Sequence, residues 1–513
     1  MANNTNEYRF RSSTRNATVA IITQITMGIA SFLERMVFNQ CFIADYLGFY
    51  SLFKNIISVL SVAELGLSVA IAYSLYAPLA EDNWEEVNAI MSFLRKVYFA
   101  IGTVILLLGL ALAPFLHLLV TTEIPMASVR LYFVVFLLST VFEYYLSYKY
   151  ILLTADQHEY VTTFITNTTW TVMYLVQICV SLFTHDFMIY SLCILLFDIA
   201  RCIAISVKAD KTYPELNLRR QQRLGKDSEH KITQNIKGLI FTKLGGVMVN
   251  STDSILISAL VGSSILGLYS NYQMITNGLL GFSRILPTAI TASLGNMGAT
   301  ESNEHVADGY RAIDMSFFMI YGLLAVVLLN ILNPIVGTFF GHDRCLPFSS
   351  ALIISILFYL YNSKSLFDTY NSSLGLYWYD RYRPIISGIA NIILSIVLGL
   401  VMGFNGILLA TIITYVAIDL WVEPMIIYHR GFHASSHRYI IFAMARLLLV
   451  VLMMLASHNL SFWLPEFGLV AIMGRGAVAS AVGALTLGLF FGRDKYVRQA
   501  IKAVKKFVFK KEG

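Results

Sequence analysis

Long apolar runs separated by short polar connections dominate the chain. Fourteen of these runs approach or exceed the roughly 20 residues that an α-helix needs to cross a hydrocarbon core. Most connections are too short to supply the polar surface that a soluble protein would need. The pattern therefore predicts an all-α polytopic membrane protein with about 14 transmembrane helices. The predicted spans lie near 17–42, 48–76, 93–119, 128–154, 160–184, 187–208, 236–260, 264–297, 311–340, 348–374, 383–402, 405–428, 438–457 and 466–491.

The amino-acid composition favours the same class. Of 513 residues, 57% are hydrophobic and 13% are charged, whereas soluble domains carry about 25% charged residues. The first apolar run begins near Ala17 and is too long for the apolar core of a signal peptide. We therefore expect it to remain in the protein as a helix.

The basic residues lie where they would set the membrane topology. The net charge is +6, and arginines and lysines cluster at 208–237 and 493–511, beside predicted spans. Such clusters are typical of cytoplasmic connections and of contacts with anionic lipids, so they do not indicate a nucleic-acid partner. An even number of spans puts both termini on one side, and the positive-inside rule predicts that this side is the cytoplasm. The expected location is the cell (inner) membrane.

One charged connection, 209–235, divides the chain after the sixth predicted span. The other connections are shorter, such as 184–186 between the fifth and sixth spans. We expect an N-terminal lobe at 1–208, a C-terminal lobe at 236–428, and two further spans with a basic tail at 429–513.

An internal repeat relates the two predicted lobes. Residues 46–53 (YLGFYSLF) match residues 265–272 (ILGLYSNY) at an offset of 219 residues, which also places Glu34 on Asp253. Because the matched spans are six apart, an even number, the two halves have the same orientation in the membrane. The repeat therefore predicts two six-helix lobes related by an axis along the membrane normal, an arrangement found in transporters.

Three stretches resemble the polysaccharide-transport branch of the MOP flippase superfamily. They are AELGLSVAIAYSLYAPLAE at 63–81, YKYILLTADQHEY at 148–160 and KLGGVMVNSTDSILISALVG at 243–262. The resemblance covers the whole chain and implies two lobes in a V around a central cavity, with two extra helices that offer a groove for a lipid tail. It also implies a function, the transfer of a lipid-linked (polyprenyl-diphosphate) oligosaccharide from the cytoplasmic to the outer leaflet.

Charged residues inside the predicted spans are the candidate functional groups, because a charge at membrane depth is costly and usually faces a protein interior or a watery cavity. Guanidinium and ammonium groups suit the oxygens of a diphosphate, and the resemblance implies a cavity arginine in the eighth span. The candidate substrate-binding residues are Arg35, Lys54, Lys243 and Arg284. The candidate residues for coupling to an ion or for gating are Glu34, Glu64 and Asp253.

Lys243 and Asp253 share one apolar stretch but cannot pair with each other. Ten residues of helix separate them by about 15 Å along the axis and about 80° around it. Lys243 shares a stripe with Asn250 and Ser254, which favours a cavity wall. Snorkelling of the amine to the membrane surface is the alternative for Lys243, and also for Lys54.

Other charged and aromatic residues have simpler interpretations. Most tyrosines at 144–150 and the aromatic residues at 377–379 are expected to belong to the membrane-interface belt. Local pairing or snorkelling is the expected role of three further pairs, namely Asp198–Arg201, Lys364–Asp368 and the like-charged Asp419–Glu423.

Three functions compete at this point. The leading one is a lipid-linked oligosaccharide flippase for surface polysaccharide biosynthesis, which works by alternating access as a monomer, with H⁺ or Na⁺ as the candidate coupling ion and no other cofactor or metal. The alternative is a cation-coupled multidrug exporter of the same superfamily, whose cavity should be net acidic. In this chain the candidate substrate-binding cations slightly outnumber the candidate coupling carboxylates, which favours an anionic ligand. A membrane polymerase or ligase would need a catalytic surface on a long outer loop, and the predicted outer loops are too short, so we expect no enzyme activity.

Overall fold

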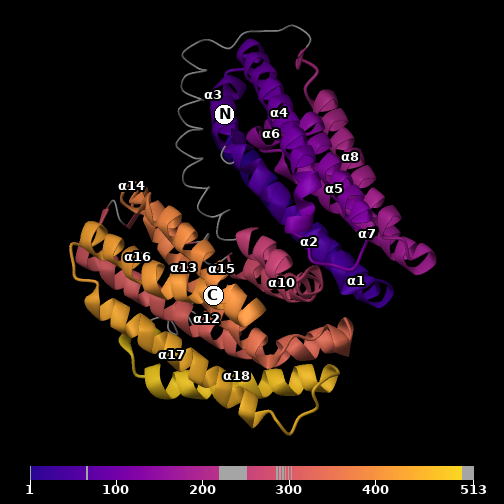
Figure 1. The fold of residues 1–513 in the computed structure, drawn as a ribbon. Coiled ribbons are helices and arrows are strands. Elements are labelled where there is room, and N and C mark those ends of the chain that lie inside the picture. Colours follow the sequence, from indigo (N-terminus) through magenta and orange to yellow (C-terminus); the bar gives the residue numbers. More distant parts are fainter. Residues whose placement is uncertain are drawn as a thin grey trace. The chain divides into compact units, whose positions relative to one another are not determined.

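All regular elements of the computed structural model are helices, and no strand occurs among the residues that it describes (Figure 1). These residues form two compact units, which we call unit 1 (residues 1–267) and unit 2 (residues 268–513). The predicted all-α class is therefore confirmed. The described residues are 2–64, 67–218 and 251–498, without 285–286, 288–289, 292–293, 295, 298–299 and 302.

Unit 1 is a bundle of helices in which α1 packs against α7, and α5 packs against both α4 and α8. Helical residues 251–260 and the first turn of α10 also belong to this unit. The elements of the unit are α1 (Ala2–Cys41), α2 (Ala44–Leu60), η1 (Ser61–Glu64), α3 (Leu67–Ala80), α4 (Trp84–Leu112), η2 (Ala113–Leu118), α5 (Met126–Leu146), α6 (Tyr150–Ala155), α7 (Glu159–Thr184) and α8 (Phe187–Thr212).

Unit 2 is built around α12, which packs against α13, α17 and α18. The last two predicted spans, α17 and α18, are thus part of the unit's packing. The elements are α10 (Ser263–Ser283, which begins in unit 1), α12 (Asn303–Phe339), η3 (His342–Arg344), α13 (Phe348–Ser373), α14 (Tyr377–Asp380), α15 (Arg383–Thr414), η4 (Tyr415–Asp419), α16 (Leu420–Ile426), η5 (Ile427–Gly431), α17 (His437–Leu460) and α18 (Leu469–Phe491).

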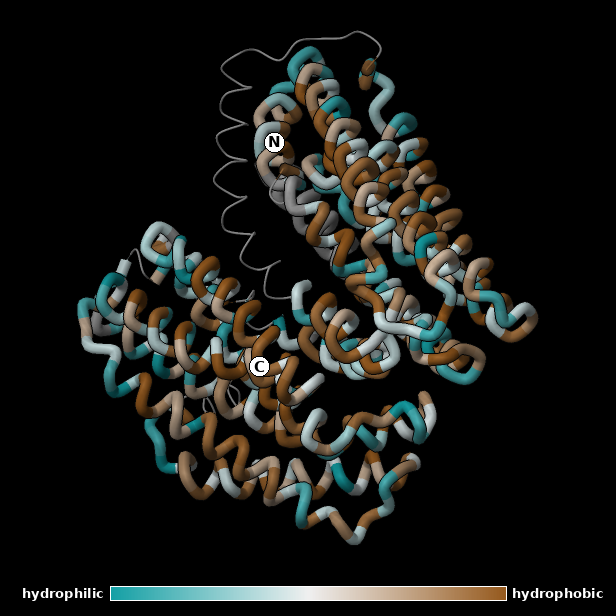
Figure 2. Tube along the Cα trace, in the orientation of Figure 1, coloured by the Kyte–Doolittle hydropathy of each residue, from teal (hydrophilic) through white to brown (hydrophobic). Residues whose placement is uncertain are grey.

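The helices carry apolar residues along their length and polar residues near their ends (Figure 2). Nine helical stretches of the described residues are long and apolar enough to cross a membrane, and one of them, Trp378–Gly431, has 54 residues. Gly403 divides this stretch with a φ of 59°, a conformation that glycine adopts without steric penalty. A polytopic membrane protein is therefore confirmed.

Two spans that the sequence predicts as continuous are broken. Within 48–76, α2 ends at Leu60 and η1 follows it before α3 begins. Within 128–154, three residues separate α5 from α6, and Lys149 among them donates to both carboxylate oxygens of Asp210 at 2.6 and 2.7 Å. In each case a charged residue at the break has partners on other helices, which hydrophobic periodicity does not reveal.

The repeat-related helices α2 and α10 meet at their N-terminal ends, within unit 1. A Cβ added at Gly48 would lie 1.9 Å from the carbonyl oxygen of Ser263, and a Cβ added at Gly267 would lie 1.9 Å from that of Ala44. The offset of 219 residues maps Ala44 onto Ser263 and Gly48 onto Gly267. The contact is therefore reciprocal, and both positions require glycine because the backbones nearly touch.

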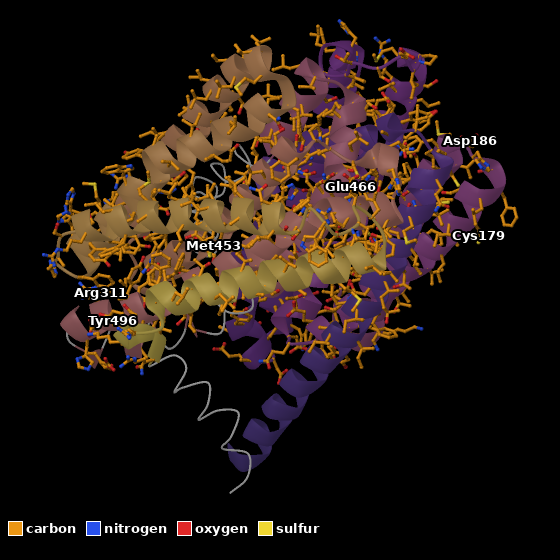
Figure 3. All side chains as sticks on the ribbon, turned by 90° about the horizontal axis from the view of Figure 1, so that it is seen from below. Cys179, Asp186, Arg311, Met453, Glu466 and Tyr496 are labelled. Carbon is orange, nitrogen blue, oxygen red and sulfur yellow. The ribbon has the colours of Figure 1, made fainter. Side chains whose placement is uncertain are left out.

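The last described residues are fastened to the start of α12. The Asp308 carboxylate accepts hydrogen bonds from the Tyr496 hydroxyl at 2.7 Å and from the Lys495 ammonium at 3.0 Å. Arg311 lies 3.3 Å from the same carboxylate, and Figure 3 shows Arg311 and Tyr496 at one end of unit 2. The chain that follows α18 is thus held at a defined point of α12.

We predict that Gly48→Ala and Gly267→Ala each destabilise the protein by about 1–3 kcal/mol, the usual cost of overpacking. Gly278→Ala is the matched control on α10, because no atom lies within 4 Å of its added Cβ. The control should be neutral or slightly stabilising, since alanine favours helix. Thermal unfolding of the purified full-length protein in detergent measures all three, and equal midpoints for the three variants would contradict the crossing.

Candidate functional site

A cavity in unit 1 contains two of the predicted site residues, Glu34 and Arg35, on α1. Its volume is about 370 Å³ including the open mouth, and α2, α7 and α8 add Tyr50, Tyr174 and Tyr190 to its walls. Glu34 is buried, and its carboxylate accepts a hydrogen bond of 2.7 Å from the Tyr190 hydroxyl. We call this space the α1 cavity.

Lys54 joins this group through Tyr50. Its ammonium lies 4.5 Å from the centre of the Tyr50 ring, and its side chain remains exposed. Tyr174 and Asp198 are near enough to interact with it electrostatically. Because Tyr50 also lines the α1 cavity, Lys54 lies beside the cavity that contains two other predicted residues, Glu34 and Arg35.

Glu64 lies at the break between α2 and α3, within a group of hydroxyls. Its carboxylate accepts hydrogen bonds from Tyr144 at 2.7 Å, Tyr98 at 3.2 Å and Ser68 at 3.3 Å. Tyr144 is buried, so for this residue the expected place in the interface belt is wrong. The hydroxyls stabilise a carboxylate that would otherwise stand in apolar surroundings.

A second group of charges joins three helices of unit 1. Arg201 lies 3.6 Å from Asp198, as the helical spacing predicts, but its shorter contact is 2.8 Å to Glu143 on α5. Asp198 also accepts hydrogen bonds from Ser139 at 2.6 Å and from Trp170 at 3.3 Å. These contacts therefore join three helices and are more than an ion pair within one helix.

Among the described residues that line the α1 cavity, neither Asp253 nor Arg284 occurs. Asp253 is buried in the helical stretch 251–260. Arg284 is exposed directly after α10. Lys243 and Asn250 lie outside the described residues, so the polar stripe predicted for that span stays a prediction. The division of the chain at 209–235 also stays a prediction, because most of that connection is not described.

Unit 2 contains a buried ionic cluster that the sequence analysis missed, which we call the Arg383 network. Arg383 binds Asp380 through two hydrogen bonds of 2.6 and 2.8 Å. It also binds Asp419 and, at 2.8 Å, Glu423. Five elements, α13, α14, α15, η4 and α16, meet here, and Arg383, Asp380 and Glu423 are all more than 90% buried.

Lys364 extends the network. Its ammonium contacts Glu423 and lies 3.7 Å from Asp368. The predicted pairing of Lys364 with Asp368 is therefore present, but Glu423 is the closer partner. Asp419 and Glu423 are not simply two like charges near a surface, because Arg383 lies between them. The sequence does contain a signal for this network. Arg383, in the segment DRYRP at 380–384, lies near the same membrane end as the charged residues of the tenth and twelfth predicted spans.

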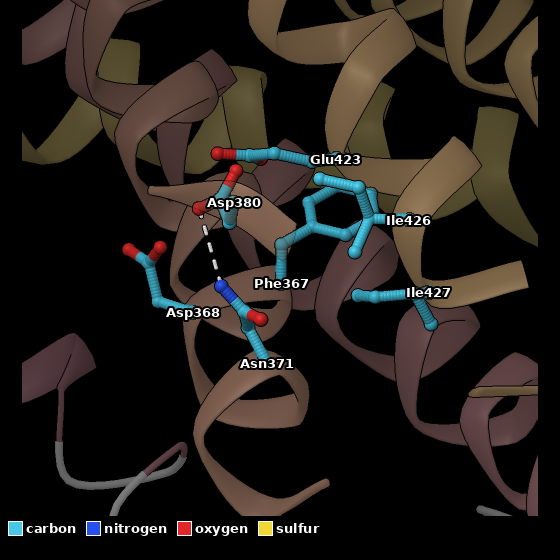
Figure 4. A pocket seen from close by; sticks show the side chains of 7 residues that line it. All are labelled: Phe367, Asp368, Asn371, Asp380, Glu423, Ile426 and Ile427. Atoms are coloured by element: carbon cyan, nitrogen blue, oxygen red, sulfur yellow. Dashed lines mark hydrogen bonds between the residues drawn. The ribbon is translucent and has the colours of Figure 1, made fainter. Parts of the chain in front are cut away.

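The network has a small acidic pocket at its side, of about 200 Å³ when the open space at its mouth is included (Figure 4). Figure 4 shows the carboxylates of Asp368, Asp380 and Glu423 on one side and Phe367 with the two isoleucines on the other. Asn371 donates to Asp380 at 3.2 Å. In the part of the chain that the structure describes, no group of three His, Cys, Asp or Glu residues has the geometry of a metal site.

Two solved structures, one of a flippase and one of a transporter, share this fold. The chain superposes on a structure described as lipid II flippase MurJ in an inward closed conformation, with a TM-score of 0.63, 14% identity, and coverage of 92% of this chain and 99% of the other. It also superposes on an inward-facing multidrug resistance MATE family transporter of the MOP superfamily, with a TM-score of 0.61, 11% identity, and coverage of 79% and 98%. These similarities establish the fold. No family model and no curated protein matches the sequence.

We predict that Arg383→Gln destabilises the protein by about 3–5 kcal/mol, because it leaves buried carboxylates without their cation. Asp368→Asn is the matched control from the same network. Its carboxylate is 59% exposed, so its loss should cost less than about 1 kcal/mol. Thermal unfolding of the full-length protein measures the difference.

A third variant keeps this prediction testable if Arg383→Gln does not accumulate in the membrane. Ser387→Ala removes a hydrogen bond of 2.9 Å to Asp419 and should cost about 1–3 kcal/mol, since it leaves a buried acceptor without one donor. Unchanged unfolding in both Ser387→Ala and Arg383→Gln would show that the network does not stabilise the fold.

Proposed function

We propose that the protein moves a lipid-linked oligosaccharide, joined to its lipid by a diphosphate, from the cytoplasmic to the outer leaflet of a cell membrane by alternating access. The observation that carries this proposal is the α1 cavity, with Arg35 in its wall and Lys54 beside it among three tyrosines. The shared fold with a lipid II flippase supports a transporter of lipid-linked cargo.

The chemistry of the α1 cavity suits a phosphorylated sugar. A guanidinium binds phosphate oxygens through parallel hydrogen bonds and stays charged when water is removed. An ammonium adds a point charge, and the rings of Tyr50 and Tyr174 offer apolar faces with polar tips for a sugar ring. Two further candidate phosphate ligands, Lys243 and Arg284, are proposed to act at other steps of the transport path.

Glu34 suits the role of the coupling group. It is a buried carboxylate with one tyrosine donor, in a cavity wall, so its charge state can respond to a proton or to Na⁺ that enters with solvent. We propose that Glu64 and Asp253 also couple transport to an ion, at other positions in the protein. Export of a negatively charged headgroup from an inside-negative cell would also be assisted by roughly 2.3 kcal/mol per charge per 100 mV.

A multidrug exporter remains the second candidate, and the fold shared with a multidrug resistance transporter favours it. The two candidates differ in the sign of charge that the cavity should prefer. A cationic drug would be repelled by Arg35 and Lys54, whereas a diphosphate would be attracted. The charge of the ligand therefore decides between them.

We predict that Arg35→Gln and Lys54→Gln each weaken binding of a fluorescent polyprenyl-diphosphate sugar by roughly 10- to 150-fold, because a hydrogen bond to a charged group contributes about 1.5–3 kcal/mol. Arg95→Gln is the matched control, since Arg95 is an exposed cation on α4 outside the cavity. Binding and leaflet transfer are measured in proteoliposomes of the full-length protein. Tighter binding of cationic dyes to the two variants, with unchanged binding of the diphosphate sugar, would instead identify a drug exporter.

We further predict that Glu34→Gln uncouples transport from the ion gradient. The amide still accepts the hydrogen bond from Tyr190, so the fold should be kept while the charge is lost. Transfer of the lipid-linked sugar is measured with and without imposed H⁺ and Na⁺ gradients. Tyr190→Phe is the control, because it removes the hydroxyl and retains the carboxylate. Equal gradient dependence in wild type and Glu34→Gln rules out this role for Glu34.

A further inference from the structure

The turn between α13 and α15 exposes a group of aromatic residues. Trp378, Tyr379 and Tyr382 are 68%, 52% and 62% exposed. The turn joins the ends of two membrane-spanning helices, where Trp and Tyr rings are enriched because one end of each ring is apolar and the other is polar. The turn therefore lies at the depth of the lipid headgroups.

Two arginines stack on these rings. The guanidinium of Arg381 lies 3.8 Å from the centre of the Trp378 ring and 4.5 Å from that of Tyr382. Arg430, from η5, lies 4.8 Å from the centre of the Tyr379 ring. One Arg381 nitrogen donates to the carbonyl oxygen of Trp378 at 2.7 Å, and the fork has further N–H groups that can donate to an anion.

Charge is unbalanced on this surface. Among the described residues, no carboxylate lies within 4 Å of Arg381 or Arg430, whereas the buried Arg383 contacts three. The nearest acid in sequence, Asp380, is already held by Arg383. Two cations therefore remain available to an anion at the headgroup depth.

The Arg383 network fixes the shape of this surface. Asp380 and Arg383 turn inward and are more than 90% buried, while Trp378, Arg381 and Tyr382 turn outward. The two hydrogen bonds between Arg383 and Asp380 thus hold the turn in one conformation. Stacking on rings further limits the rotamers of the two arginines, so less freedom is lost when an anion binds.

We propose that Arg381 and Arg430, framed by Trp378, Tyr379 and Tyr382, form a binding site for the phosphate of an anionic membrane lipid. A guanidinium fork matches phosphate oxygens, and the flanking rings bury themselves at the boundary between headgroups and acyl chains. The positive-inside rule places this turn in the cytoplasmic leaflet, where anionic lipids create a negative surface potential. The site is independent of the transported cargo.

The experiment reconstitutes the full-length protein in phosphatidylcholine bilayers that contain a series of fractions of acyl-brominated phosphatidylglycerol. Bromine quenches nearby tryptophan fluorescence, and subtraction of the Trp378→Phe signal isolates Trp378. In wild type, brominated phosphatidylglycerol should quench Trp378 at much lower fractions than brominated phosphatidylcholine does. Arg381→Gln and Arg430→Gln should each reduce this preference by about fivefold, because an arginine near an anionic surface contributes about 1 kcal/mol to binding.

The matched control removes two exposed cations elsewhere, in Arg95→Gln/Lys96→Gln on α4. An unchanged preference in this control, with a loss in Arg381→Gln/Arg430→Gln, supports the site. An equal loss in both double variants would reduce the effect to net charge and overturn the proposal. If the wild-type protein showed no preference for brominated phosphatidylglycerol, the rings would form only an interface belt, and the proposal would also be overturned. Displacement by soluble inorganic diphosphate would show a site for free phosphate, which contradicts a lipid site.

Discussion

A charge inside a membrane-spanning protein needs a partner, because the surrounding medium does not solvate it. This constraint decides which helices are neighbours at several points of the structure. Arg383 joins α14 and α15 to α16 in unit 2, and Arg201 joins α5 to α8 in unit 1. Arg446 of α17 binds Asp314 of α12. Apolar packing alone would allow these helices to slide or rotate against each other, whereas each ion pair fixes one register.

The same constraint separates structural charges from functional ones. In the Arg383 network, hydrogen bonds of 2.6 and 2.8 Å hold buried groups together, and a ligand could displace one partner only by leaving another buried charge uncompensated. The α1 cavity differs, because Lys54 stays exposed above Tyr50 and Glu34 has a neutral donor in Tyr190. Groups of this kind can exchange water for a ligand at small cost. This difference supports the roles proposed here, the network as a stabiliser and the α1 cavity as a binding site.

Hydropathy predicted the class of fold and most helix positions because a span must be apolar over a fixed length. It did not predict the break that contains Glu64, because the three hydroxyls that hold this carboxylate come from α3, α4 and α5. It missed the Arg383 network for the same reason, since its members are separated by up to 59 residues in sequence. Glu34 and Arg35 were found from sequence because a charge in an apolar run is visible there without knowledge of its partners.

The internal repeat preserves a backbone contact between its two copies but does not preserve all of their charged side chains. The offset of 219 residues relates Gly48 to Gly267, and the structure places these two glycines in one reciprocal contact. It also relates Glu34 to Asp253, so both halves keep an acid at this position. The cations differ, however, because Arg35 maps onto Ser254 and Lys54 onto Gln273. The two related helix pairs thus share a crossing point and a carboxylate, while Arg35 and Lys54 of the first pair have no cationic repeat mates in the second. The proposed phosphate site of the α1 cavity therefore depends on Arg35 and Lys54, two positions at which the repeat does not keep the charge.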